Sequence, residues 1–349
     1  SRKEHFIMGL NKESGLKIGK GTPGKRNLIT DVPGVTVGHV TIRDGKDVNT
    51  GVTAILPHQG NIFQDKVMAA SAVINGFGKT MGLVQVEELG TIETPIIMTN
   101  TLSIGTAATA LIKYMLEQNP DIGLQTGTVN PLVCECNDGR MNDIRGLHVT
   151  EEDVLQAIRN CGEDFEEGVV GSGTGMCCLG LKGGIGSASR VVKLGDTEYT
   201  IGALVMSNFG AAGNLMINGR HMGQEIQEKL AQEKKDQGSI IMLLATDIPL
   251  SERQLKRICR RAGVGLARTG SYYGNGSGDI AIAFTTANRV PHYSKTPFVD
   301  MKMMDDESID PVLEMSAEAV EEAIISSLYH APTTVGRAGR VQRGMRDFL

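Results

Sequence analysis

The stretch that decides the fold is QGSIIMLLATD, residues 237–247. A polar, charge-rich segment at 224–236 precedes it, and the apolar run that follows carries no charge until Asp247. Such a run is typical of a buried strand. Ser239 therefore stands where an exposed linker enters the core. Two interpretations stay open: an ordinary strand-entry residue, or a nucleophile that becomes a chain terminus when the linker is cut.

The composition indicates a globular α/β protein. A chain of 349 residues with 40% hydrophobic residues permits one large domain or two smaller ones, with ample material for a core. The 44 glycines and the absence of Trp favour tight turns and aliphatic packing. A formal net charge of −5 without a dominant basic block argues against a nucleic-acid-binding protein. We interpret the four arginines of the tail as a solvated terminus or a subunit contact: Arg337, Arg340, Arg343 and Arg346.

The six cysteines predict neither a zinc site nor a disulfide framework. Cys134 and Cys136 are one residue apart, and Cys177 and Cys178 are adjacent, which are not metal-binding spacings. Reduced, buried thiols in a cytoplasmic protein are the expectation. No apolar stretch reaches the roughly 20 residues that span a bilayer, and residues 1–20 lack a signal-peptide core, so we expect no membrane partner.

Apolar periodicity predicts alternating strands and helices within one domain, residues 1–349. A strand, a Pro-Gly turn and a second strand are expected within 27–40, and a strand pair around Gly195-Asp196. Ser251 and Gln254 match a helix capping box. The further expected strands are 51–56, 69–76, 93–99 and 280–285. The expected helices are about 104–117, capped by Thr101-Leu102-Ser103, then 150–160, 251–263 and 311–329. We expect the helices to lie outside two layers of sheet.

The glycine-rich segment 169–192 contains Gly171-x-Gly173-x-Gly175, which suggests a phosphate-binding loop. A bare glycine pattern is a weak signal without a strand–turn–helix context and a distal acid. Residues 183–186 are instead expected to form hairpin turns. A phosphate-binding module without enzymatic activity is kept as a rival hypothesis.

Polar residues stand at the ends of three apolar strands: Asn208, Ser239, and Ser277 with Asp279. Acyl transfer needs a hydroxyl nucleophile, a proton acceptor, a group that orients it and an oxyanion donor. A free α-amino group, with a pKa near 7.7–8.0, can serve as the base if the bond before Ser239 is cut. Whether that amine or the Ser277/Asp279 pair is the base stays open. The histidines show no evident partner that competes for this role: His148, His221 and His292.

Glu135 interrupts a short apolar run within 129–143. A carboxylate buried there without a partner is costly. Glu135 is therefore either on an exposed strand edge or a carboxylate that receives a cationic ligand.

These features together resemble the self-processing aminopeptidases of peptidase family S58, which include the L-aminopeptidase/D-amidase/D-esterase and the β-peptidyl aminopeptidases. The resemblance covers nearly the whole chain. It is carried by DVPGVTVGH (31–39), GVTAILP (51–57), NGFGK (75–79), EELGTIETP (87–95), GTGM (173–176), KGGIG (182–186), SNFG (207–210), Gly238-Ser239 and Ser277-Gly278-Asp279.

The resemblance implies an α/β/β/α sandwich that is similar to the N-terminal-nucleophile hydrolases but differs in strand connectivity. It implies a precursor that cuts itself between Gly238 and Ser239, giving pieces 1–238 and 239–349. A homotetramer of processed protomers is implied as well, with no metal and no organic cofactor.

By the same resemblance, Ser239 is the nucleophile, Ser277 and Asp279 assist proton transfer, and Asn208 helps to bind the oxyanion. Glu135 then belongs to the pocket for the substrate's ammonium group.

Position 137 is Asn, whereas the best-known member of the family has Tyr there. Because of this difference, the substrate preference of this chain can differ from that of the family member. The implied substrates are short peptides, amino-acid amides or esters. An acyltransferase similar to ornithine acetyltransferases, or a pantetheine hydrolase, is the alternative within the same fold.

Overall fold

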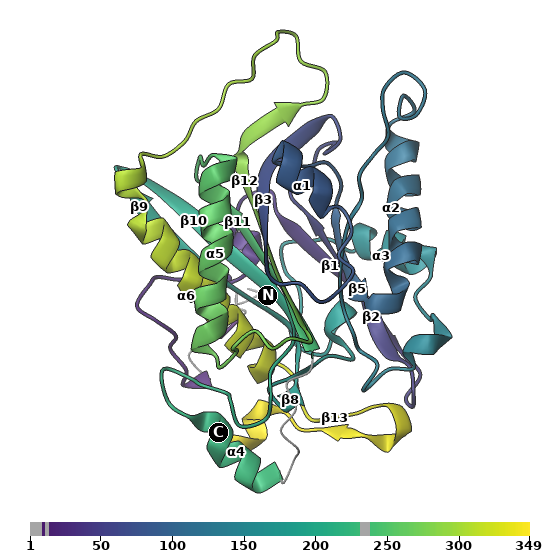
Figure 1. Ribbon diagram of the computed structural model, residues 1–349, viewed down its shortest axis with the longest axis vertical. Helices are drawn as coiled ribbons and strands as arrows, with labels where there is room; N and C mark the ends of the chain where they lie inside the picture. The colour runs from purple at the N-terminus through teal and green to yellow at the C-terminus, as the bar shows by residue number, and fades with distance from the viewer. Residues whose placement is uncertain (1–8, 11–13, 231–237) are drawn as a thin grey trace, which may run out of the picture.

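Two β-sheets lie face to face, and helices cover their outer surfaces (Figure 1). The structure is a computed structural model that describes residues 9–10, 14–230 and 238–349. The larger sheet has the order β4 (Thr91–Ile92), β3 (Asp65–Asn75), β12 (Ser277–Pro291), β11 (Gly238–Thr246), β10 (Thr197–Asn208) and β9 (Gly184–Leu194). The smaller has the order β1 (Thr36–Arg43), β2 (Asn49–Leu56), β5 (Ile96–Asn100) and β6 (Leu132–Cys136).

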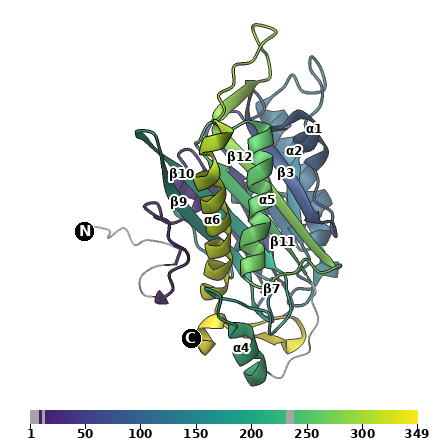
Figure 2. The same ribbon diagram turned by 60° about the vertical axis from the view of Figure 1, so that its left-hand side comes forward.

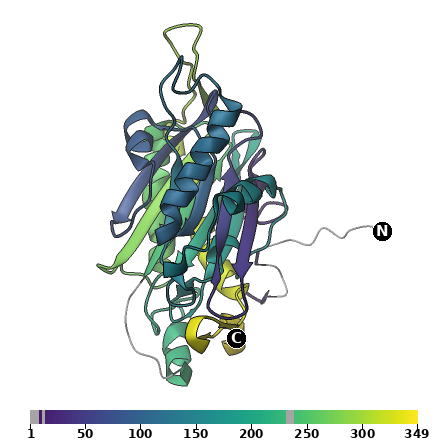
Figure 3. The same cartoon turned by 90° about the vertical axis from the view of Figure 1, so that its right-hand side faces the viewer.

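The helices form the two outer layers. Helices α5 (Glu252–Arg268) and α6 (Asp310–Tyr329) lie side by side on the six-stranded sheet (Figure 2). Helices α2 (Ile104–Gln118) and α3 (Glu151–Arg159) cover the four-stranded sheet, on the side that faces the viewer in Figure 3. The α/β/β/α sandwich expected from the sequence is therefore confirmed.

The remaining elements are short. They are α1 (Leu83–Leu89), α4 (Met222–Leu230), the β7–β8 pair (Cys177–Cys178 and Leu181–Lys182), the β13–β14 pair (Thr334–Val335 and Val341–Gln342), and 3-10 turns at Ile29–Asp31, Thr101–Ser103, Ile144–Gly146, Gly171–Gly173, Asp306–Ser308, Arg337–Gly339 and Met345–Phe348.

Strand β11 shows why four layers form. Successive side chains of a strand point to opposite faces. In β11 the even positions, such as Met242, pack with α5 and α6, whereas the odd positions, such as Leu243, pack between the two sheets. A strand that is apolar on both faces has to be central, and β11 lies between β10 and β12. A third cluster joins the four-stranded sheet to α2 and α3.

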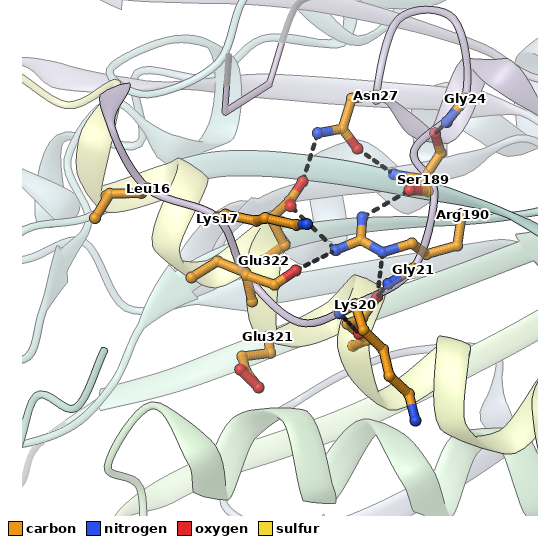
Figure 4. A network of polar contacts seen from close by, with 12 residues as sticks. Leu16, Lys17, Lys20, Gly21, Gly24, Asn27, Ser189, Arg190, Glu321 and Glu322 are labelled. Atoms are coloured by element: carbon orange, nitrogen blue, oxygen red, sulfur yellow. Dashed lines mark hydrogen bonds and ion pairs between the residues drawn. The ribbon is translucent and has the colours of Figure 1, made fainter. Parts of the chain in front are cut away.

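A buried arginine binds the N-terminal arm, the segment around Lys20 and Gly21, to the sandwich (Figure 4). Arg190, 1% exposed, donates to Glu318 at 2.5 Å and to Glu322 at 3.0 Å, both of which are on α6. The main-chain N–H groups of Lys20 and Gly21 donate to the same Glu318 carboxylate. One buried charge network therefore ties together the arm, β9 and α6.

Several local predictions are confirmed. Ser251 and Gln254 form the expected capping box at the start of α5. The hairpin turn at Gly195-Asp196 joins β9 to β10. The expected strands near 51–56, 69–76, 93–99 and 280–285 correspond to β2, β3, β5 and part of β12.

Other local predictions are wrong. Residues 29–31 form a 3-10 turn rather than a strand, because Asp31 accepts hydrogen bonds from the main chain at Arg26 and Leu28. Residues 184–186 lie in β9 rather than in a turn. The 224–236 segment, expected to be an exposed linker, is mostly exposed up to Leu230 but is helical there, in α4, and 231–236 lies outside the described residues.

Candidate active site

Strand register brings the predicted catalytic residues to one end of the six-stranded sheet. Asn208, the last residue of β10, pairs with Ser239 of β11 in antiparallel register. Ser239 pairs with Gly278 of β12 in parallel register, so that Ser277 and Asp279 flank the serine's neighbour. Three segments that are far apart in the sequence therefore meet within three adjacent strands.

A cavity of about 310 Å³ opens in front of Ser239. Its lining comes from the segment after β3, from the ends of β5 and β6, and from the starts of β11 and β12: Phe77, Gly78, Lys79, Thr101, Glu135, Asn137, Gly238, Ser239 and Gly276. This volume is at the small end of ligand pockets, which suits a substrate of one or two residues. The lining includes Ser239, Glu135, Asn137 and Gly238 of the predicted site. Asn208, Ser277 and Asp279 lie behind the cavity in the adjacent strand positions.

Glu135 is buried, with 5% of its surface exposed, although β6 is the edge strand of its sheet. The interpretation of Glu135 as an exposed edge residue is therefore wrong. Its Oε1 accepts the main-chain N–H of Lys79 at 2.9 Å, and its Oε2 accepts the hydroxyl of Thr101. Neither donor carries a positive charge, so these contacts orient the carboxylate without neutralising it. A buried carboxylate held in this way favours a cationic ligand.

Gly78 leaves the carboxylate open to the cavity. A Cβ atom at this position would lie 2.6 Å from Oε1 of Glu135, closer than van der Waals contact permits. Of the two glycines in the NGFGK stretch, Gly78 is the one whose missing Cβ permits this close approach of main chain to carboxylate.

Ser277 and Asp279 form a buried pair. The Ser277 hydroxyl donates to Oδ1 of Asp279 at 2.8 Å, and both residues are at most 2% exposed. Because side chains alternate along a strand, this pair and the Ser239 side chain lie on opposite faces of the sheet. The charge of Asp279 contributes, after burial, to raising the pKa of Tyr273, whose hydroxyl donates to Gly263 of α5. Asp279 therefore faces the α5 side, next to the main chain of Gly238 and Ser239.

Both the nitrogen and the oxygen of the Asn208 side-chain amide form hydrogen bonds. Its Nδ2 donates to the carbonyl of Asn137 at 3.1 Å, and its Oδ1 accepts the N–H of Cys177 at 3.0 Å. Asn137 in turn accepts the N–H of Gly139 through its own Oδ1. The carboxamide is fixed in direction beside Ser239, as an oxyanion donor has to be.

Gly238 can only be glycine. Its φ of +134° is rarely adopted by other residues, and a Cβ atom would lie 1.7 Å from the carbonyl oxygen of Asn208. The main chain immediately before Ser239 is consequently pressed against β10.

Cys136 lies next to Ser239, the predicted nucleophile, and its own thiol is unsuited to that role. Its thiol is within hydrogen-bonding reach of the Ser239 hydroxyl. Burial, followed by the charge of Glu135, raises the pKa of the Cys136 thiol far above its usual range. A thiol that stays protonated is a poor nucleophile. All six cysteines are free thiols, as expected.

The glycine-rich loop is not a phosphate cradle. The N–H groups of Gly171 and Ser172 donate to Thr41 and Thr53, so they are not available to an anion. The loop instead presents carbonyls to Lys182, whose Nζ donates to the carbonyls of 173, 176 and 183 at 3.2, 2.6 and 2.8 Å. The loop therefore surrounds the ammonium group of Lys182, which is a cation from the protein itself.

The histidines among the described residues lie outside the cavity lining. His148 contacts Asp143, and His292 contacts Thr126, so two of the three that seemed unpartnered in the sequence have partners. Among the described residues, no group of three or more His, Cys, Asp or Glu side chains could hold a metal ion. No helix in the described part of the chain is long and apolar enough to cross a bilayer.

Sequence reasoning missed Thr101 and Lys79. Thr101 was assigned to a helix cap, but the local cap is made by Asn100, whose side chain accepts the N–H of Leu102. Lys79 lies within the NGFGK stretch, which contributed to the family resemblance. Only the fold shows that the main chain of Lys79 binds Glu135.

Comparisons with known proteins agree with this geometry. The model of peptidase family S58 matches residues 27–342. The chain is 37% identical over 342 residues to the beta-peptidyl aminopeptidase BapA of Sphingosinicella microcystinivorans, covering 91% of this chain and 85% of that protein.

Solved structures share the whole fold. The PH0078 protein from Pyrococcus horikoshii OT3 is 56% identical with a TM-score of 0.92, covering 96% of this chain and 95% of that one. The L-aminopeptidase D-Ala-esterase/amidase from Ochrobactrum anthropi is 40% identical with a TM-score of 0.86, covering 95% and 94%. The latter is described as a prototype for the serine aminopeptidases and a new variant among the Ntn hydrolase fold.

Proposed function

The chain belongs to peptidase family S58 and is a serine aminopeptidase, and we propose that its nucleophile is Ser239, released when the protein cuts its own Gly238–Ser239 bond. The relatives are named as aminopeptidases, so the acyltransferase or pantetheine-hydrolase alternative is not favoured. The observation that carries the proposal is the shared cavity. Ser239 and the buried Glu135 both line it, and the groups that donate to the Glu135 carboxylate are uncharged.

Self-cleavage begins with attack of the Ser239 Oγ on the Gly238 carbonyl carbon. The C–N bond breaks as the C–O bond forms, and the amide nitrogen takes up a proton to become the free amine of Ser239. Water then hydrolyses the ester, leaving the Gly238 carboxylate at the end of piece 1–238. The close approach of Gly238 to Asn208 supports this step, because it holds the scissile carbonyl in one orientation.

Turnover of substrate uses the same hydroxyl. The substrate's ammonium binds Glu135, which places the carbonyl of its first residue at Ser239. The Ser239 amine accepts the hydroxyl proton, and the Ser277–Asp279 pair orients that amine from the opposite face of the sheet. The Asn208 amide carries two N–H groups: one is held by the Asn137 carbonyl, and the other is the donor for the oxyanion. Water releases the acyl group.

An N-terminal ammonium bound in this way makes the enzyme remove single residues from short peptides, amino-acid amides or esters. No step requires a metal or an organic cofactor. The lining position held by Asn137, rather than Tyr, bears on which of these substrates is preferred.

The assembly and location are further parts of the proposal. We infer a homotetramer of processed protomers from the family resemblance, with neither nucleic acid nor membrane as a partner. Six free thiols support a reducing compartment such as the cytoplasm.

Intact mass spectrometry of purified wild-type protein and of Ser239→Ala tests the proposal. The wild type should consist of pieces 1–238 and 239–349 and should hydrolyse alanine p-nitroanilide. Ser239→Ala should remain one chain without activity. If Ser239→Ala is still cut at that bond, or retains activity, Ser239 is not the nucleophile.

A further inference from the structure

A second charged residue lines the cavity, and the proposed reaction does not use its side chain. Lys79 lines it together with Glu135, and these two are the charged residues of the lining. The main-chain N–H of Lys79 is occupied by Glu135, while its side chain is exposed. Among the described residues, no acidic side chain lies within ion-pair distance of the Lys79 ammonium; the lysines with such partners are Lys20, Lys66, Lys113 and Lys256.

From this arrangement we propose that Lys79 forms a carboxylate subsite, and that the preferred substrates carry an ammonium and a carboxylate on one small molecule. The inference rests on the proposed function. The ammonium binds Glu135, the scissile carbonyl lies at Ser239, and the substrate carboxylate binds the Lys79 ammonium.

The geometry favours a small doubly charged substrate. A cavity of about 310 Å³ holds a molecule the size of a dipeptide, so both of its charges lie close to the two protein charges. The Lys79 main chain is fixed against Glu135, and its flexible four-carbon stem lets the ammonium follow a ligand within the same cavity. An amino-acid amide has only the ammonium, and therefore satisfies half of this charge pattern.

The carboxylate has two possible sources. It is either the C-terminus of a dipeptide, on the leaving group, or the side chain of an acidic N-terminal residue, on the acyl group. Both present the same chemistry to Lys79, and paired substrates separate them. Ala-Ala against Ala-Ala-amide reports the C-terminus, and Asp-Ala-amide against Asn-Ala-amide reports the side chain.

The measurement is the ratio of kcat/KM within each pair, for the wild type, Lys79→Met and Lys79→Arg. Lys79→Met removes the charge but keeps an apolar stem, and it should lower one of the two ratios about fivefold. Lys79→Arg keeps the charge and should retain most of that ratio. Lys193→Met, the same substitution at an exposed lysine outside the cavity lining, is the matched control.

A fall in the first ratio assigns the subsite to a dipeptide C-terminus, and a fall in the second assigns it to an acidic first residue. If neither ratio changes in Lys79→Met, or if Lys193→Met changes them equally, the subsite does not exist. The proposed function stands in that case, provided that wild type hydrolyses alanine p-nitroanilide and Ser239→Ala does not. A wild type that hydrolyses none of the substrates overturns both proposals.

Discussion

Replacing Glu135 by Gln should weaken the preference for a free amine while leaving the fold intact. Gln keeps an oxygen to accept the Lys79 N–H, and its amide can donate to the Thr101 hydroxyl where the carboxylate accepted from it. The side chain has nearly the same volume, so the buried site stays filled. What disappears is the negative charge on which the proposed ammonium site depends.

The expected loss follows from that charge. A hydrogen bond between two charged groups in a buried site is worth roughly twice a neutral one, and losing the charge costs about 2 kcal/mol. This corresponds to about a thirtyfold fall in kcat/KM for alanine p-nitroanilide. Thr101→Val is the graded control: it removes one neutral donor and keeps the charge, so it should cost only about 1 kcal/mol, or roughly fivefold.

The assay compares alanine p-nitroanilide with N-acetyl-alanine p-nitroanilide at one pH, for wild type, Glu135→Gln and Thr101→Val. In wild type the free amine should be strongly preferred, and in Glu135→Gln that preference should fall about thirtyfold. Equal losses for the free and the acetylated substrate would refute the ammonium role and would assign Glu135 to maintaining the cavity.

Three further predictions concern the Glu135 site and two buried charges elsewhere in the fold. Gly78→Ala should lower kcat/KM for free-amine substrates at least tenfold more than for acetylated ones, and should also lower the melting temperature, because its Cβ would lie 2.6 Å from the Glu135 carboxylate and its φ of +156° is rarely adopted by other residues. Asp138→Asn should flatten the dependence of melting temperature on pH between about 4 and 7. Because burial raises the pKa of Asp138 to about 7, the contribution of this carboxyl group to stability is present below pH 4 and is lost as pH rises through 7. A profile as steep as that of the wild type would contradict this. Glu318→Ala should destabilise the fold by about 3–5 kcal/mol in urea unfolding, since Arg190 would lose a buried partner, and a loss below 1 kcal/mol would show that Glu322 alone suffices.

Local signals in the sequence predicted the elements that are decided locally. The uninterrupted apolar run after Ser239 predicted a buried strand, and β11 is central to the six-stranded sheet. The capping box at Ser251 predicted the start of α5. These succeed because the strand's two apolar faces and the helix cap are each complete within a few residues.

The failures occur where distant contacts decide the structure. The burial of Glu135 depends on Lys79 and Thr101, which approach it from two other segments, so its surroundings cannot be read from its neighbours in sequence. Ser277 and Asp279 were singled out in the sequence as a possible proton-transfer pair, but only the pairing of β12 with β11 shows that they face away from the Ser239 hydroxyl. Strand order and register are properties of the assembled sheet.

The same strand order determines what a cut before Ser239 does to the molecule. Strand β12, from piece 239–349, pairs with β3 of piece 1–238, and β11 pairs with β10. Side chains from both pieces fill the two cores that flank this sheet, and each fully buried Ile, Leu or Met contributes about 1.5–3 kcal/mol. Separating the pieces would therefore be equivalent to unfolding. We expect cut protein to elute as one species in native size-exclusion chromatography and to resolve into two chains only in denaturant; pieces that separate under native conditions would show that the shared sheet does not hold them. Since the orientation of Gly238 depends on β10, cleavage has to follow folding, and unfolded precursor should remain uncut.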